Sequence, residues 1–343
     1  MIIKENVSLL PYNTFKINVI AKRFSFFSGV EELQELPEFA KPSRERLLIL
    51  AGGSNLLFTG DFDGLVLKNE VGGIDLVAED EDYVYVRAGA GENWHRFVRY
   101  CLDRDWAGVE NLSLIPGSVG AGPMQNIGAY GVEIREVFQE LEAYHIREKK
   151  VYTFSLNDCE FGYRESVFKR KYRGQFVILN VVFRLRKRPV FNTQYGAIRE
   201  ELEKMGVGEL SIQAISRAVI HIRSSKLPDP AVIGNAGSFF KNPEVSADKF
   251  TALREGFPGI LGYPVNGEAG GSGKVKLAAG WLIEQCGWKG YRRGDAGCHA
   301  AQALVLVNYG KATGKEIYEL STEILQSVKD RFGVELEREV NIV

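Results

Sequence analysis

Cysteine and histidine are scarce in this sequence, with four of each among 343 residues. Four cysteines are too few for a disulfide framework, and no two of them form the C-x-x-C pair typical of zinc and redox sites. The four histidines do not cluster along the chain, so a metal site has little support. We therefore expect a cytoplasmic protein with reduced thiols and without a metal.

Net charge is also nearly absent, because 43 Lys and Arg side chains oppose 44 Asp and Glu side chains. This balance gives no electrostatic reason to expect a nucleic acid or a membrane surface as partner. Lys4 and Glu5 interrupt the stretch where a signal peptide would be apolar. The longest uncharged run, residues 111–132, contains five glycines and two prolines and would break as a membrane-spanning helix.

What is present is an ordinary globular composition in a chain long enough for two domains. In the first half, apolar and alternating runs predict strands, and apolar residues at helical spacing from Trp94 to Leu102 predict a helix within residues 91–103. The predicted strands of the first half are residues 46–51, 64–68, 74–77, 83–88 and 176–185.

The second half mixes helices and strands. Apolar spacing predicts helices over 211–223 and 277–286, and a capping box formed by Thr313 and Glu316 predicts the start of a third helix. Residues 334–343 alternate between acidic and apolar side chains, which predicts a strand. Because strands and helices do not alternate regularly, we expect an α+β fold rather than a doubly wound sheet.

Two glycine-rich turns are candidates for phosphate binding. Gly89-x-Gly91 follows a predicted strand and opens a predicted helix, as a dinucleotide fingerprint would, but Trp94 occupies the place of the third glycine. Gly52-Gly53-Ser54-Asn55 follows a buried strand, and its amides and side chains suit an anion. An ordinary hairpin turn has the same pattern.

Residues 115–133, which contain most of the uncharged run and end on Glu133, are a third candidate. A glycine-rich loop without charge loses chain entropy unless something orders it, and long loops of this kind are usually functional. Its backbone N–H groups, together with Gln125 and Asn126, suit a diphosphate or a flat heterocycle. A covered connection between strands is the alternative.

Single residues complete the candidates. Ser238 lies between Gly237 and two phenylalanines, outside any G-x-S-x-G elbow and without a histidine base, which argues against a hydrolase. It suits proton donation or phosphate binding, although a turn serine has the same surroundings. Arg164 and Glu339, taken alone, are typical of surface charges.

Together these motifs resemble one family, the UDP-N-acetylenolpyruvoylglucosamine reductases, which are flavoenzymes also called UDP-N-acetylmuramate dehydrogenases. The resemblance runs nearly from end to end and is specific because many motifs occur in the same order. The matching motifs are residues 13–15, 53–55, 89–95, 115–133, 161–166, 226–230, 234–243, 277–283 and 336–340.

The resemblance implies an FAD-binding domain of the vanillyl-alcohol-oxidase/PCMH type over residues 17–188, with lobes of about 1–71 and 72–188. A connecting segment, 189–227, would contain a helix and a loop with Tyr195, as in the longer, type I members. Residues 228–343 would form an α+β C-terminal substrate-binding domain.

The resemblance also implies the reaction. NADPH would reduce FAD, and the reduced flavin would convert the enolpyruvyl ether of UDP-N-acetylglucosamine into the lactyl ether of UDP-N-acetylmuramate, a peptidoglycan precursor. The partner is then a small nucleotide sugar, and no protein partner is implied. Another FAD-dependent oxidoreductase of the same fold and a non-catalytic nucleotide-sugar-binding relative are the alternatives.

Site residues follow from the resemblance by motif. The catalytic set would be Arg164, Ser238 and Glu339. The flavin would be lined by Gly52, Gly53, Ser54, Asn55, Pro116, Gly117, Gln125, Asn126 and Gly128. The substrate would meet Tyr163, Tyr195, Arg223, Lys226, Asn242 and Gln302.

Four positions depart from the family pattern. Ala51 stands where many members have a glycine, Ala121 and Gly122 replace a common pair of serines, and Asn341 stands where an arginine often follows. None of these departures touches the implied catalytic set.

The implied chemistry suits the residue types. Hydride transfer to C3 of the enolpyruvyl group places negative charge on C2 and its carboxylate, which a fixed guanidinium such as that of Arg164 stabilises. C2 then needs a proton donor, for which the Ser238 hydroxyl is the candidate. Glu339, if buried beside the substrate carboxylate, would hydrogen-bond as the neutral acid.

Overall fold

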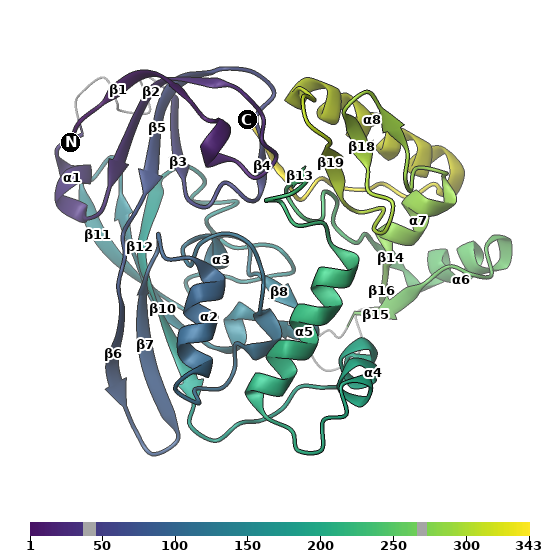
Figure 1. The fold of residues 1–343 in the computed structure, drawn as a ribbon, viewed down its shortest axis with the longest axis horizontal. Coiled ribbons are helices and arrows are strands. Elements are labelled where there is room, and N and C mark those ends of the chain that lie inside the picture. Colours follow the sequence, from purple (N-terminus) through teal and green to yellow (C-terminus); the bar gives the residue numbers. More distant parts are fainter. Residues whose placement is uncertain (37–45, 266–272) are drawn as a thin grey trace. The chain divides into compact units, whose positions relative to one another are not determined.

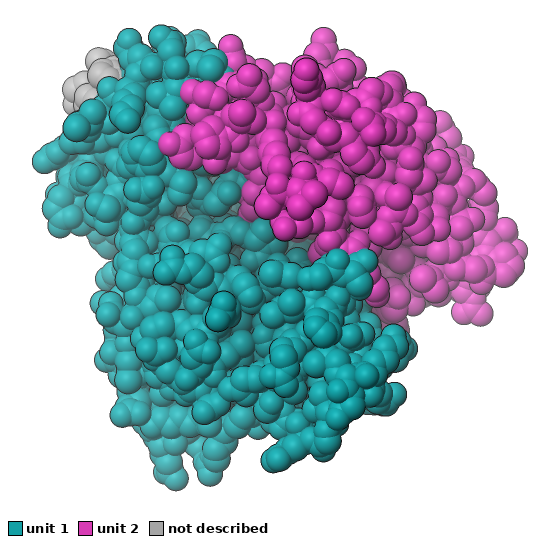
Figure 2. Space-filling model, viewed as in Figure 1, with its two compact units in different colours: residues 1–7, 20–53, 62–225 teal, residues 8–19, 54–61, 226–343 magenta. Residues whose placement is uncertain are grey.

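The computed structural model describes residues 1–36, 46–265 and 273–343. The chain divides into two compact units (Figure 2). Unit 1 contains residues 1–7, 20–53 and 62–225, and unit 2 contains residues 8–19, 54–61 and 226–343. Two short segments from the N-terminal part of the chain thus belong to unit 2, a contribution that the sequence does not indicate.

The larger sheet of unit 1 is antiparallel, with the strand order β11-β10-β12-β7-β6 (Figure 1). Its strands are β6 (Ile74–Glu79), β7 (Tyr83–Gly89), β10 (Phe138–His145), β11 (Lys150–Ser155) and β12 (Phe176–Arg186). Helix α2 (Trp94–Leu102) packs its apolar stripe on this sheet, where the rings of Phe97 and Phe183 lie 4.6 Å apart. The predicted periodicity of residues 94–102 is therefore the buried face of a helix.

A second sheet of unit 1 has the order β1-β2-β5-β3 and contains parallel pairs. Its strands are β1 (Lys4–Ser8), β2 (Ile20–Phe27), β3 (Arg46–Leu50) and β5 (Phe62–Asn69). Leu65 and Leu67 of β5 are fully buried and anchor a small core with Phe27 and Tyr144. Further helices of this unit are α1 (Val30–Gln34), α4 (Gly196–Lys204) and α5 (Ile212–Lys226), whose last residue is counted in unit 2.

The uncharged run is built from short elements rather than from an open loop, which corrects the sequence-based expectation. Helix α3 (Ala121–Met124) and strands β8 (Gly128–Ala129) and β9 (Val132–Glu133) lie within residues 115–133. The 3₁₀ helix η3 (Glu110–Leu112) precedes them, and the 3₁₀ helix η4 (Ile134–Glu136) follows them. The two strands pair with each other. Local backbone hydrogen bonds thus help to order this glycine-rich segment, which its composition alone would leave flexible.

The described residues of unit 2 form three small sheets, which are accompanied by helices. Its sheets have the orders β13-β19-β18-β17, β14-β16-β15 and β20-β4. The strands are β4 (Leu56–Leu57), β13 (Gly234–Asn235), β14 (Glu244–Ser246), β15 (Gly262–Pro264), β16 (Lys274–Leu277), β17 (Arg292–Arg293), β18 (Ala296–Cys298), β19 (Leu306–Asn308) and β20 (Asn341–Ile342). The helices are η1 (Leu10–Tyr12), α6 (Ala247–Gly256), α7 (Ala279–Gln285) and α8 (Gly314–Phe332).

Helix α8 begins as the sequence predicts. The Thr313 hydroxyl accepts the N–H of Glu316, and the Glu316 carboxylate accepts the N–H of Thr313, which completes the capping box. Gly333 ends the helix in the left-handed conformation, with φ of 60°. The predicted helix over 277–286 is shorter, because residue 277 belongs to β16 and α7 begins at residue 279.

The prediction of a strand over residues 334–343 is wrong. Only β20 and an isolated bridge between Phe240 and Arg338 are sheet-like there. The alternation itself is real, because Leu336 and Val340 are buried while Glu335 and Glu337 are exposed. An extended chain buries alternate side chains even without a hydrogen-bonded ladder, so the pattern predicted the exposure correctly and the pairing incorrectly.

Among the described residues, no helix combines the length and the apolar character needed to cross a membrane.

Candidate active site

Two glycine turns predicted to line a flavin meet in unit 1. A Cβ atom built on Gly52 would lie 2.8 Å from the Cα atom of Gly117, so the two backbones touch. Gly117 has φ of 116°, a conformation that L side chains rarely adopt. Residues 52–53 and 116–117, far apart in sequence, therefore bring their backbones together in one cradle, in which Gly52 is exposed, Gly117 half-buried and Gly53 buried. N–H groups of such a glycine-rich backbone can approach an anion.

Ser118 is a residue of this cradle that the sequence did not single out. Its side chain is 4 % exposed, and its hydroxyl oxygen has no hydrogen-bond partner among the described residues. A buried hydroxyl without a partner carries a free-energy cost that a bound ligand would remove. Its place between Gly117 and Gly120 was the available signal in the sequence.

The Gly89-x-Gly91 turn has a packing role. A Cβ on Gly91 would lie 2.8 Å from the Cα atom of Glu70, and a Cβ on Gly89 would meet the carbonyl oxygen of Val71. The two glycines thus allow the backbone of residues 69–72 to lie directly against the turn at residues 89–91. This explains their spacing without a dinucleotide phosphate, in agreement with the missing third glycine.

Arg164 lies in a tight turn that directs it toward the uncharged run. Gly162 and Glu165 exchange two backbone hydrogen bonds, which places Tyr163 and Arg164 at the tip, and Arg164 has φ of 54°. Its Nη2 atom donates to the carbonyl oxygen of Gly128 at 2.6 Å.

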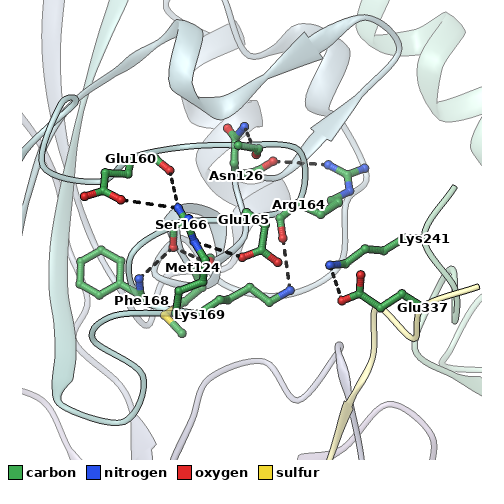
Figure 3. A network of polar contacts seen from close by, with 12 residues as sticks. Met124, Asn126, Glu160, Arg164, Glu165, Ser166, Phe168, Lys169, Lys241 and Glu337 are labelled. Atoms are coloured by element: carbon green, nitrogen blue, oxygen red, sulfur yellow. Dashed lines mark hydrogen bonds and ion pairs between the residues drawn. The ribbon is translucent and has the colours of Figure 1, made fainter. Parts of the chain in front are cut away.

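Figure 3 shows the Arg164 guanidinium group directed toward Asn126, whose carbonyl oxygen accepts from Nη1 at 3.4 Å. Lys169 donates to the Arg164 carbonyl oxygen (Figure 3). The guanidinium group is therefore held against the candidate flavin segment.

The side chain of Asn126 is a structural cross-link. It is fully buried, its Nδ2 donates to Glu133 and to the carbonyl oxygen of Gly162, and its Oδ1 accepts the N–H of Arg135. Because its side-chain groups are hydrogen-bonded within the protein, we expect only the backbone of Asn126 to face the flavin.

The predicted substrate residues Tyr195 and Arg223 lie in the same region of unit 1. The rings of Tyr130 and Tyr195 meet edge to face at 5.4 Å. Burial lowers the pKa of the Arg223 guanidinium group, and the positive charge of Arg164 lowers that pKa further. Two guanidinium groups beside two phenols suit an anionic ligand such as a carboxylate or a diphosphate.

Unit 2 brings Ser238 and Glu339 together through the backbone. The carbonyl oxygen of Phe239 accepts the N–H of Glu339 at 2.8 Å, so the residue directly after Ser238 is bonded to Glu339. Gly237, with φ of 68°, forms the turn before Ser238, and its N–H is held by the Oδ1 atom of Asn235 at 2.9 Å.

Asn55 lies beside Glu339 as well. Its Nδ2 atom donates to the Glu339 carbonyl oxygen at 3.4 Å, and its own carbonyl oxygen accepts from the Asn341 side chain at 2.9 Å. The departure at residue 341 therefore has a role in this chain, because the asparagine amide fixes Asn55.

The departure at residue 122 fits its surroundings too, since a Cβ on Gly122 would lie 2.6 Å from the Ile134 side chain.

The other predicted substrate residues are less closely joined. Asn242 accepts the N–H of Ala279 at 3.0 Å, and a Cβ on Gly280 would lie 3.0 Å from Gln302 Oε1, so both amides lie at the start of α7. Lys226 is exposed and is the last residue of α5, three residues after Arg223 and thus on the same helix face.

The three predicted catalytic residues are divided between the units, with Arg164 in unit 1 and Ser238 and Glu339 in unit 2. In the described part of the chain, no three His, Cys, Asp or Glu side chains are placed to hold a metal ion.

Comparison with known proteins identifies relatives over the whole chain. A family model for the C-terminal domain of UDP-N-acetylenolpyruvoylglucosamine reductase matches residues 229–343, and a model for an FAD binding domain matches residues 22–147. The UDP-N-acetylenolpyruvoylglucosamine reductase of Amoebophilus asiaticus is 50% identical over 343 residues, which is 100% of both chains. That of Pseudomonas syringae pv. tomato is 49% identical over 99% of this chain and 98% of its own.

Solved structures agree on the fold. The UDP-N-acetylenolpyruvylglucosamine reductase of Thermus caldophilus has a TM-score of 0.68 at 23% identity, with 99% of each chain covered. A solvent-stable cholesterol oxidase has a TM-score of 0.51 at 12% identity, with 97% of this chain and 86% of that chain covered. The expected fold class, an FAD-binding domain of the vanillyl-alcohol-oxidase/PCMH type followed by an α+β domain, is confirmed.

The family models and the close relatives lead to the same conclusion. The chain is an FAD-binding oxidoreductase, and it belongs to the family of UDP-N-acetylenolpyruvoylglucosamine reductases.

Proposed function

We propose that this chain reduces the enolpyruvyl ether of UDP-N-acetylglucosamine to UDP-N-acetylmuramate, a peptidoglycan precursor, with NADPH as hydride donor and FAD as carrier. The observation that carries the proposal is the fixed guanidinium group of Arg164, held by the carbonyl oxygen of Gly128 at the segment expected to line the flavin. The names of the close relatives support the substrate.

The residues present fit FAD. Gly52 and Gly117 are in backbone contact, so a larger side chain at residue 52 would not fit between them. The buried Ser118 hydroxyl has no hydrogen-bond partner among the described residues, and a bound ligand would supply one. We assign the diphosphate to this cradle, together with Gly53, Ser54 and Asn55, and the ring to Pro116, Gln125, Asn126 and Gly128. When bound, FAD supplies hydride transfer from NADPH to C3 of the enolpyruvyl group.

In this assignment the chain's own residues bind the substrate and move one proton. Arg164 binds the carboxylate of the enolpyruvyl group and stabilises the negative charge that grows on C2. The Ser238 hydroxyl donates the proton that C2 takes up, and Glu339, joined to the next peptide, hydrogen-bonds near the same carboxylate. Arg223 and Lys226 bind the diphosphate of the nucleotide, while Tyr163, Tyr195, Asn242 and Gln302 line the substrate.

We further propose that residues 17–188 bind the flavin, that 189–227 connect, and that 228–343 bind the substrate. A cytoplasmic location stays a prediction from the sequence.

The test separates the two half-reactions. Transfer of hydride from NADPH generates no carbanion, so Ser238→Ala should be reduced by NADPH at a nearly normal rate. Its anaerobic reoxidation by the enolpyruvyl substrate should fall by at least ~10²-fold, the low end for a lost general acid. Cysteine at this position should recover part of the rate, since a thiol also donates a proton.

The matched control is Ser327→Ala on helix α8, which should leave both rates unchanged. Stopped-flow absorbance of the flavin measures them. Normal reoxidation of Ser238→Ala at saturating substrate contradicts the assignment of the acid. A wild-type protein that NADPH reduces but the enolpyruvyl substrate does not reoxidise contradicts the proposed function itself.

A further inference from the structure

The proposed function makes no use of the motif at residues 89–95, although the structure places this motif along the candidate flavin segment. The indole Nε1 of Trp94 donates to the carbonyl oxygen of Leu112 at 2.8 Å, and the Trp94 N–H donates to that of Gly117 at 3.0 Å. The N–H of Gly120 donates to the carbonyl oxygen of Ala90 at 2.9 Å. Ala90 and Trp94 are therefore joined to the backbone of residues 112–120 by three hydrogen bonds.

Within this arrangement Leu114 has an unusual backbone. Its φ is 58°, in the left-handed region that a leucine rarely occupies without support from its surroundings. It precedes Ile115 and Pro116, so its conformation sets the direction in which the chain enters the cradle at Gly117. Whatever fixes the Leu114 peptide therefore also fixes that entry.

Two side chains bind the polar groups of Leu114. Its N–H donates to the Nδ1 atom of His95 at 3.0 Å, and its carbonyl oxygen accepts from Nε of Arg223 at 3.2 Å. His95 lies in the first turn of α2 and Arg223 near the end of α5, and both belong to unit 1. The peptide is thus held between two helices.

The His95 contact requires the neutral ring. Because Nδ1 accepts a hydrogen bond, the proton of the imidazole is on Nε2. A protonated ring would carry a hydrogen on Nδ1, directed at the Leu114 N–H, and the bond would be lost. Burial lowers the pKa of His95, and the charges of Arg99, on the same helix, and Arg223, on α5, lower it further.

We propose that His95 is a positioning residue for the flavin: its ring accepts the Leu114 N–H and so holds residues 114–117 in the conformation that the FAD diphosphate needs. This inference rests on the proposed assignment of the Gly52–Gly117 cradle to FAD. His95 itself touches the backbone and does not need to touch the cofactor.

Three substitutions distinguish the role of His95 as a hydrogen-bond acceptor from its role in filling space. His95→Asn keeps an acceptor that does not titrate, because the amide oxygen of an asparagine branches from the same carbon position as Nδ1 of a histidine. His95→Leu keeps the bulk and removes the acceptor. His221→Asn is the matched control, because His221 is exposed and its charged neighbour is Glu201.

FAD affinity is measured by titrating each apoprotein with FAD, and hydrogen exchange reports on the Leu114 amide. At pH 7.5 we expect His95→Leu to bind FAD about 10-fold more weakly, the effect of one lost hydrogen bond at a strained peptide, with faster exchange at Leu114. His95→Asn should stay within about threefold of wild type, and His221→Asn should match it.

The pH profile gives a readout that a purely structural role would not move. The wild-type FAD affinity should be full above the ordinary histidine pKa of 6.5 and fall as the pH drops through the lowered pKa of His95. His95→Asn should lack that part of the fall.

Wild-type FAD affinity in His95→Leu overturns the inference, and so does an equal loss in His95→Asn and His95→Leu. If instead the assignment of the cradle to FAD is wrong, Gly52→Ala should also keep its full FAD affinity. Weakened binding in Gly52→Ala with normal binding in His95→Leu would therefore contradict the role of His95 alone.

Discussion

The contact between Gly52 and Gly117 permits a quantitative prediction for Gly52→Ala. The added Cβ would lie 2.8 Å from Gly117 Cα, whereas ordinary contacts begin at 3.4 Å, so the two backbones must separate by the difference, about 0.6 Å. A hydrogen bond of about 2.9 Å from this backbone to a phosphate oxygen would lengthen to about 3.5 Å, the limit of a useful bond.

The loss of one such charge-assisted bond costs about 1.5 to 3 kcal/mol, which corresponds to FAD binding about 10- to 150-fold weaker. Quenching of FAD fluorescence during titration of the apoprotein measures the affinity, and thermal unfolding confirms that the variant is folded. Gly60→Ala is the control, because a Cβ there meets nothing within 4 Å. Full FAD affinity in folded Gly52→Ala would refute the reasoning.

Tyr195→Ala removes the ring that faces Tyr130 and should weaken binding of the enolpyruvyl substrate about 3- to 10-fold with FAD binding intact; equal calorimetric affinities would contradict this. Thr313→Ala removes the capping box of α8 and should cost about 1 kcal/mol in urea unfolding, whereas an unchanged midpoint would contradict the cap. Burial raises the pKa of Cys159 and of Cys298 to about 12, so neither thiol should react with iodoacetamide at pH 8 in the native protein; rapid native labelling of either would show the burial to be wrong.

Features that depend on neighbours in sequence were predictable. The spacing from Trp94 to Leu102 gave helix α2 because helical periodicity is a local property, and the pair Thr313 and Glu316 gave the start of α8 for the same reason. The run ending at Leu50 gave β3. The candidate residues themselves came from motifs and resemblance, without any indication of their contacts.

Features that depend on distant segments were not predictable. Alternation over residues 334–343 indicates an extended chain but does not indicate which strand lies beside it. A continuous ladder was therefore expected where only an isolated bridge and the two-residue strand β20 exist. The hydrogen bond from Arg164 to Gly128 joins residues 36 positions apart. Likewise, the three internal hydrogen bonds of the Asn126 side chain depend on Glu133, Arg135 and Gly162, which no pattern connects with it.

The discontinuous composition of unit 2 has a consequence for synthesis on the ribosome. Asn308 Nδ2 donates to the carbonyl oxygen of Phe15, 293 residues earlier in the chain. At roughly 5 to 20 residues per second, Phe15 is synthesised some 15 to 60 s before Asn308. During that interval the apolar side chains of residues 8–19 and 54–61, among them Phe15, Ile17, Leu57 and Phe58, which are buried in the complete fold, have not yet met their partners in unit 2. The nascent chain therefore presents two apolar segments that chaperones can bind until residues 226–308 have been synthesised, and a fragment that stops at residue 225 lacks these partners altogether.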